Sequence, residues 1–76
     1  MTPYKNLGGD SCVLEFEITE DAIQVVFASG RCRNYLYEAR RPGKAFVDQM
    51  KVLALQGRGL NSFISTVVKA NYTRKW

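Results

Sequence analysis

Four side chains suited to binding a nucleic acid recur at every second position in the stretch SGRCRNYLY, residues 29–37. Arg31 and Arg33 are followed by Tyr35 and Tyr37. Because alternate residues of an extended strand lie on one face, the two guanidiniums and the two phenols would share a side. Guanidiniums bind phosphates bidentately, and aromatic rings stack on unpaired bases. The spacing indicates a surface for single-stranded RNA or DNA, provided that this side faces solvent.

A basic segment, ARRPGK at 39–44, follows directly. Arg40, Arg41 and Lys44 could extend the positive surface past the end of the strand. The whole chain carries 11 Lys and Arg against 7 Asp and Glu, a net charge of +4, which favours acidic partners in a general way. Small proteins also carry such a charge for solubility alone, so a plain solvated exterior remains an alternative.

Three segments are expected to form an antiparallel meander. Residues 11–18 alternate between apolar and polar side chains, as a strand with one buried face does. Residues 22–28 are rich in β-branched and aromatic side chains, which favour strands, and residues 31–38 are expected to form the third strand after a hairpin loop. The inward set of the first strand is Cys12, Leu14, Phe16 and Ile18.

The orientation of the third strand follows from the turn that precedes it. Ser29-Gly30 fits a two-residue hairpin loop, in which Gly supplies the positive φ that such turns need. Counting outward from this turn places Gln24 opposite Tyr35 and turns Cys32 inward. With that register, the Arg and Tyr side chains point away from the core, and Cys12 and Cys32 are buried thiols that fill space.

Two helices are expected after the meander. Residues 44–56 place their apolar side chains on one helical stripe, and Gly57 is suited to end that helix. Asn61 is a plausible N-cap for the second helix. The apolar residues of that helix recur with helical spacing: Leu60, Phe63, Ile64, Val67 and Val68.

The chain is therefore predicted to be α+β: a three-stranded antiparallel meander followed by two helices packed on one sheet face (β-β-β-α-α). Residues 1–10 form a lead-in, 11–70 a single domain, and 71–76 a basic and aromatic tail that frays. A domain of 76 residues has a small core, and small domains are often stabilised by a partner chain.

The order of several short motifs resembles the KTSC domain, a module named for the C-terminus of some lysyl-tRNA synthetases and also found as small bacterial proteins. A YxY motif is followed by a proline, a helix and a Gly-Asn-Ile series; these are Tyr35-Leu36-Tyr37, Pro42, the helix through Ala54, and Gly57, Asn61 and Ile64. The similarity spans roughly residues 4–70. It implies a non-catalytic module, with RNA binding suggested by the synthetase attachment.

Enzyme activity is not expected. The chain has no histidine, so the commonest general base and the commonest metal ligand are both missing. The two cysteines form no CxxC pair, and Gly43-Lys44 lacks the first glycine and the Ser or Thr of a phosphate loop. We predict no cofactor and no metal. The N-terminal residues do not form a secretion signal, and no apolar segment is long enough to cross a membrane, so a cytoplasmic protein is expected.

Protein binding is the alternative function. Glu15 and Glu17 are expected on the same outer sheet face as the arginines and would repel phosphate. Val52 and Leu55 lie on the side of the first helix away from its apolar stripe. They are candidates for a contact with another protein or with a second copy of the chain, although packing against the second helix would also explain them.

Overall fold

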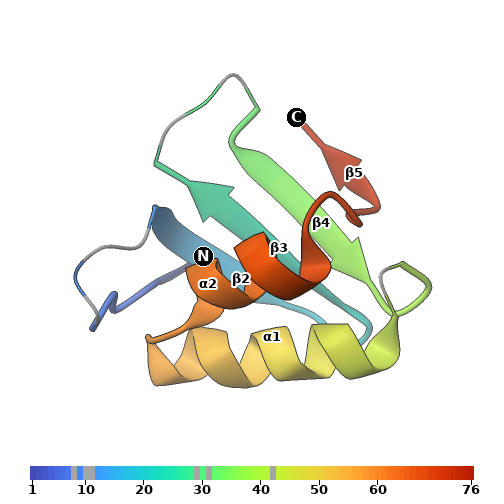
Figure 1. Ribbon diagram of the computed structural model, residues 1–76, viewed down its shortest axis with the longest axis horizontal. Coiled ribbons are helices and arrows are strands. Elements are labelled where there is room, and N and C mark those ends of the chain that lie inside the picture. Colours follow the sequence, from blue (N-terminus) through green and yellow to red (C-terminus); the bar gives the residue numbers. More distant parts are fainter. Residues whose placement is uncertain (8, 10–11, 29, 31, 42) are drawn as a thin grey trace.

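The computed structural model describes residues 1–7, 9, 12–28, 30, 32–41 and 43–76. An antiparallel sheet with strand order β1-β2-β3-β4-β5 lies behind two helical segments (Figure 1). The elements in chain order are β1 (Thr2–Pro3), β2 (Val13–Ile18), β3 (Ala22–Phe27), β4 (Asn34–Glu38), α1 (Lys44–Gln56), α2 (Leu60–Phe63), the π-helix η1 (Ile64–Val68) and β5 (Arg74–Lys75).

The α+β class, the antiparallel sheet and the two helices are as predicted, but the strand count of three is wrong. The sheet gains β1 from the predicted lead-in and β5 from the predicted tail. Strand β1 pairs with β2, and β5 pairs with β4 through Tyr35 opposite Lys75 and Leu36 opposite Arg74. Each added strand has two residues, which is too short for the alternation of side chains to indicate a strand.

The predicted register of the third strand is also wrong, by one residue. Val25 lies opposite Tyr35, Ile23 opposite Tyr37, and Gln24 opposite Leu36. The ladder closes with a hydrogen bond from the Phe27 N–H to the Arg33 carbonyl at 2.8 Å, so the connection is longer than a two-residue turn. A shift of one residue exchanges the two faces of a strand. The two phenols therefore face the helices.

Strand β2 contains a second departure from the expected alternation. Val13 and Phe16 are both buried, whereas Leu14 is exposed. The register with β3 shifts between Val13 and Glu15, as it does at a β-bulge, where an extra residue turns the following side chains to the other face. The prediction that Leu14 and Cys12 point inward is thus wrong: Cys12 is exposed.

The helices follow the sequence pattern more closely. Helix α1 has the predicted bounds, and Gly57 ends it in the left-handed conformation with φ 74°. Helix α2 begins at Leu60, directly after Gly59 with φ 82°, so the predicted N-cap at Asn61 is wrong. Leu60 is fully buried, and the helix starts two residues earlier than an N-cap at Asn61 would indicate.

The core lies between the sheet and the helices. The hydroxyl of Tyr4 accepts a hydrogen bond of 3.2 Å from the Leu60 N–H, which holds the N-terminal segment against the second helix. Full burial of an aliphatic or aromatic side chain stabilises a fold by about 1.5–3 kcal/mol, so a small set of residues supplies most of the stabilisation. The fully buried side chains are Tyr37, Ile23, Met50, Leu60, Val25 and Val47.

Candidate functional site

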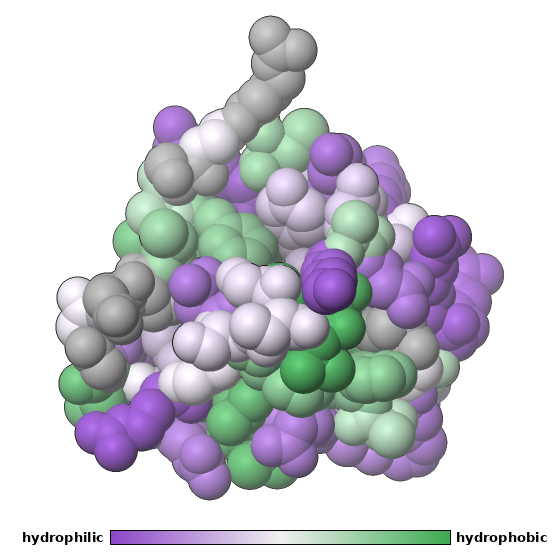
Figure 2. Space-filling view, viewed as in Figure 1, coloured by the Kyte–Doolittle hydropathy of each residue, from purple (hydrophilic) through white to green (hydrophobic). Residues whose placement is uncertain are grey.

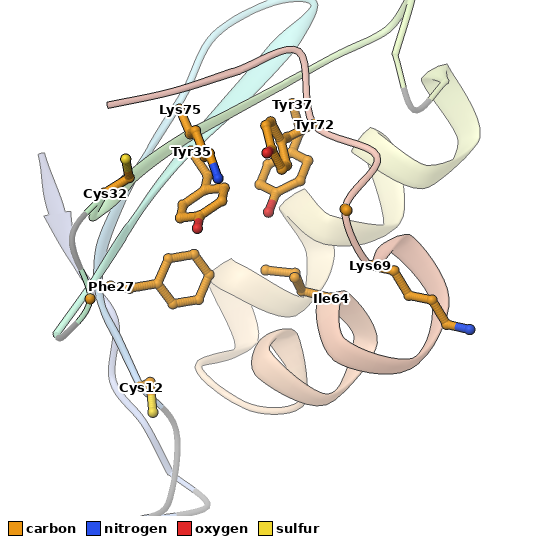
Figure 3. A pocket seen from close by; sticks show the side chains of 11 residues that line it. Cys12, Phe27, Cys32, Tyr35, Tyr37, Ile64, Lys69, Tyr72 and Lys75 are labelled. Carbon is orange, nitrogen blue, oxygen red and sulfur yellow. The ribbon is translucent and has the colours of Figure 1, made fainter.

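A groove of about 610 Å³ opens beside β3 and β4, on the helix side of the sheet (Figure 3). The end of β3, the strand β4 and the segment that follows η1 form its walls. The lining residues are Cys12, Phe27, Gly30, Cys32, Tyr35, Tyr37, Ile64, Lys69, Ala70, Tyr72 and Lys75. A groove of this size accommodates a small organic molecule or one unit of a polymer.

Aromatic rings form most of the apolar wall. The ring of Tyr35 meets Phe27 edge to face with centroids 5.1 Å apart, and meets Tyr72 in the same way at 5.2 Å. The rings of Tyr35 and Tyr37 are nearly parallel, 6.4 Å apart. Edge-to-face pairs contribute about 0.5–1.5 kcal/mol each beyond the area that they bury. These contacts fix Tyr35, which is half-buried, in one position along the groove.

Lys75 is the cation placed against these rings. Because Lys75 pairs with Tyr35 in the sheet, its side chain lies on the helix side (Figure 3). Its ammonium lies 5.4 Å from the centre of the Tyr72 ring. A hydrogen bond with Tyr72, and then the charges of the Tyr72 and Tyr35 phenols, raise the pKa of Lys75 above its usual value. The groove thus has a fixed positive charge beside its aromatic wall.

Lys69 also lines the groove, but its side chain extends away from the rings (Figure 3). Its backbone has φ 54°, and its N–H donates to the Ile64 carbonyl at 2.6 Å, which ends the π-helix. Lys69 is therefore available to a ligand that extends beyond the groove, and it does not contact the aromatic wall.

The predicted Arg and Tyr surface does not form. Tyr37 is 1% exposed and Tyr35 faces the groove, whereas Arg33 is exposed and donates to the Gly30 carbonyl at 3.5 Å. Arg31 lies outside the described residues. The one-residue register shift turned both tyrosines toward the helices, so the outer sheet face does not carry the two phenols.

Burial governs the chemistry of Tyr37. Loss of solvent, followed by the charges of the Tyr35 and Tyr72 phenols, raises the pKa of Tyr37 well above its ordinary value. A phenol this deeply buried cannot stack on a base. Both predicted stacking residues line the groove, but only Tyr35 is exposed enough to offer its ring to a ligand.

The basic segment after β4 is largely occupied by local partners. Arg40 pairs with Glu38 at 3.2 Å, and Lys44 pairs with Asp48 at 2.8 Å. Arg41 donates to the Asn71 side-chain oxygen at 3.1 Å. Exposed pairs of this kind contribute little and open easily, so these cations remain accessible, but carboxylates offset the charge of two of the three.

Three important groove residues were not singled out from the sequence. Phe27 lies within the expected strand at 22–28, and Tyr72 and Lys75 lie within the expected fraying tail at 71–76. The run YTRKW at 72–76 does contain aromatic and β-branched residues, which favour a strand. That composition was the available signal for a fifth strand, and with it for the wall of the groove.

The candidate protein-contact residues Val52 and Leu55 are exposed. Leu55 is 64% exposed and Val52 is 47% exposed, both on the outer side of α1. On the helix side of the molecule, hydrophobic surface alternates with hydrophilic side chains (Figure 2). The hypothesis that Val52 and Leu55 contact another protein stays a prediction.

The two cysteines do not fill the core. Cys12 is exposed and Cys32 is half-buried, both as free thiols at the groove. Within the part of the chain that the structure describes, no three or more Cys, Asp or Glu side chains are grouped in a way that could hold a metal ion. A search of the same residues finds no helix with the length and apolar character to cross a membrane.

Comparison of the chain with protein-family models, with curated proteins and with solved structures found no match.

Proposed function

We propose that the protein is a small non-catalytic binding module that holds single-stranded RNA or DNA by taking an unpaired base into the aromatic groove. The observation that supports this is the wall formed by Phe27, Tyr35 and Tyr72, with the Lys75 ammonium beside it. This combination of flat apolar rings and a cation suits a base joined to a phosphate. The proposed surface replaces the outer sheet face that the sequence indicated.

The size and polarity of the groove favour a base over a chain of aliphatic groups. Its volume of about 610 Å³ exceeds what one base fills and leaves room for a sugar. The hydroxyls of Tyr35 and Tyr72 can donate to or accept from the edge of a base. Stacking on a protein ring contributes about 1–3 kcal/mol per base, enough for weak binding of one nucleotide.

Charge contributes the rest of the affinity. Lys75 lies against the rings, and the exposed Lys69 lines the groove. The exposed Arg41 makes hydrogen bonds with Asn71 and Thr73, the two neighbours of Tyr72. A strand whose base enters the groove would bring its neighbouring phosphates toward these side chains. Binding should then weaken with salt, at a log–log slope of about −0.7 for each phosphate contacted. The resemblance to the KTSC domain favours RNA over DNA as the strand.

The test is an NMR titration of isotope-labelled protein with short single-stranded RNA and DNA of mixed sequence. The titration is done at about 50 mM and at about 200 mM salt. We expect chemical-shift changes at Tyr35, Tyr72 and Lys75, smaller at high salt. The substitution Lys75→Glu should weaken binding at least about fivefold. Lys51→Glu makes the same charge change on α1, away from the groove, and serves as the matched control.

A second pair of variants separates stacking from charge. Tyr35→Leu removes the ring and should weaken binding by about fivefold or more, whereas Tyr35→Phe keeps the ring and should bind within about twofold of the unchanged protein. Circular dichroism verifies that each variant is folded. The proposal is wrong if neither nucleic acid shifts any groove residue at the lower salt concentration, or if Lys51→Glu weakens binding as much as Lys75→Glu.

A further inference from the structure

The face of the sheet opposite the helices carries a regular arrangement of side chains. One row of paired residues crosses four strands, from Glu17 on β2 through Gln24 and Leu36 to Arg74 on β5. These residues alternate with the core-facing ones, so they project from the other face. None of the four belongs to the buried core. Among the described residues, no helix or loop contributes a core cluster on this side.

A second row runs beside the first. Glu15 lies opposite Val26, and Val26 lies opposite Asn34. Asn34 and Trp76 exchange backbone hydrogen bonds of 3.0 and 2.9 Å, so Trp76 completes the row beyond β5. Both rows therefore begin with a carboxylate on β2, and a cation or an aromatic ring stands at the β5 end.

The centre of this face has little unsatisfied polarity. Gln24 donates from its side-chain amide to the Asn34 side-chain oxygen at 3.1 Å, so the two amides satisfy each other in part. Val26 and Leu36 lie diagonally beside them and are half-buried. Trp76 is 46% exposed. An apolar centre with paired amides can be covered by another surface at a small desolvation cost.

Among the residues that the structure describes, no ion pair involves the charges at the two ends of these rows. The ion pairs between described residues are Arg40–Glu38 and Lys44–Asp48, and neither involves Glu15, Glu17 or Arg74. Glu38 on β4 alternates with Tyr37 and so lies on this face, where Arg40 offsets its charge. The guanidinium of Arg74 lies 5.2 Å from the centre of the Trp76 ring, which holds it over the outer surface. The face is thus negative along β2, apolar in the middle and positive along β5.

We propose that this outer sheet face binds the same face of a second copy of the chain, with the two-fold axis parallel to the strands and between β3 and β4. Rotation about that axis places β2 of one copy over β5 of the other. Each row keeps its position along the strand direction, so it lies over the same row of the second copy. Glu17 of one copy then faces Arg74 of the other, twice in the dimer. Gln24 faces Leu36, and Val26 faces Asn34.

The charge pattern selects this axis. A two-fold axis across the strands would set β2 against β2 and place glutamates opposite glutamates, which is repulsive. A nucleic acid is disfavoured on this face because Glu15 and Glu17 repel phosphate. A second copy brings Glu17 and Arg74 together at both ends of the first row, since each of the two finds its complement on an identical face. The groove lies on the other side of the sheet, so self-association leaves it open and does not depend on the proposed nucleic-acid function.

The test is sedimentation equilibrium of the full chain at concentrations up to about 1 mM and at low salt. We expect a dimer whose Kd rises with salt. Arg74→Glu and Glu17→Arg should each weaken the dimer at least about tenfold, since each places like charges opposite one another. The charge-swapped double variant, with both substitutions in one chain, should recover the dimer.

Mixing the two single variants gives an independent outcome. Arg74→Glu makes both ends of the face negative, and Glu17→Arg makes both ends positive, so the mixture should form a heterodimer although neither variant dimerises well alone. Trp76 is the only tryptophan, and its fluorescence should shift to shorter wavelength as the dimer forms. Leu55→Glu on α1 is the control and should change nothing.

A strict monomer at all these concentrations overturns the proposal. So does a dimer that Leu55→Glu disrupts and Arg74→Glu leaves intact, because that result assigns self-association to the outer side of α1. Failure of the double variant to dimerise, with its fold verified by circular dichroism, rules out the Glu17–Arg74 contact.

Discussion

The ring of Tyr72 meets the ring of Tyr35 edge to face, with centroids 5.2 Å apart. This contact holds the segment after η1 against β4. The next residue, Thr73, donates its N–H to the Leu36 carbonyl at 2.8 Å and its hydroxyl to the Arg41 carbonyl at 2.9 Å. Strand β5 follows directly, so the fifth strand and one wall of the groove depend on the same anchor.

Replacing Tyr72 tests that anchor. Tyr72→Ala removes a half-buried ring and its edge-to-face partner, and should lower the free energy of unfolding by about 2 kcal/mol. Tyr72→Phe keeps the ring and should stay within about 0.5 kcal/mol of the unchanged protein. Urea unfolding gives the free energies, and amide exchange at Thr73 reports whether β5 detaches. Equal stabilities of the two variants would show that the ring does not hold the segment.

Tyr37 should make the stability of the protein fall at high pH. Burial raises the pKa of Tyr37 above its ordinary value of 10.0. As the pH rises past about 10, the unfolded chain releases this proton while the folded chain keeps it. The contribution of Tyr37 to the free energy of unfolding is complete below about pH 10. Above that pH it falls by about 1.4 kcal/mol per pH unit, until the pH reaches the pKa of Tyr37 in the folded protein.

Tyr37→Phe separates this effect from the other titrating groups. Urea unfolding of both proteins at about pH 9 and about pH 11 should show that the unchanged protein loses about 1.4 kcal/mol more than the variant. The remaining loss is common to both, because it comes from the lysines and the other phenols. The same pH dependence in both proteins would mean that Tyr37 ionises freely in the folded state.

Local signals in the sequence were sufficient for α1 but not for the start of α2. Helix α1 has its predicted bounds because a long apolar stripe and the left-handed Gly57 agree on where it lies. The predicted register between β3 and β4 depended instead on the assumption of a two-residue turn. A longer connection shifts every β3–β4 residue pair by one and turns the opposite set of β4 side chains toward the helices. The composition of β4 is compatible with either orientation.

The candidate site was harder to predict for the same reason. Tyr35 is a predicted binding residue, but its partner Lys75 comes from a two-residue strand and its partner Tyr72 from the segment just before that strand, both far away in the chain. Such a short strand has no detectable period. The bulge in β2, which exposes Leu14 and Cys12, likewise has no glycine to indicate it.

Gly57 should tolerate substitution less well than Gly59, although both have a positive φ. A Cβ on Gly57 would lie 2.6 Å from the Cβ of Lys5, whereas one on Gly59 would meet only a Leu53 methyl at 3.5 Å. Gly59→Ala should cost about 1 kcal/mol, for the left-handed backbone alone. Gly57→Ala should cost at least about 2 kcal/mol, because the N-terminal segment must also move.

Measuring both glycine substitutions in a Lys5→Gly variant identifies the cause of the difference between them. This variant lacks the colliding side chain, so the cost of Gly57→Ala measured by urea unfolding should fall toward that of Gly59→Ala. The cost of Gly59→Ala itself should not change in that variant. If Gly57→Ala still lowers the free energy of unfolding by the same amount without the Lys5 side chain, the loss of stability comes from the backbone conformation.

The two thiols should react at different rates, and a molecule in the groove should slow both. Cys12 is exposed and Cys32 is half-buried, and both line the groove. In the folded protein, a disulfide reagent should modify Cys12 at a rate within about tenfold of the unfolded chain, with Cys32 slower. Cys12→Ser and Cys32→Ser variants assign the two phases. If the proposed base enters the groove, saturating single-stranded RNA should slow the labelling of both cysteines severalfold, whereas the rates would be unchanged if the RNA bound elsewhere or not at all.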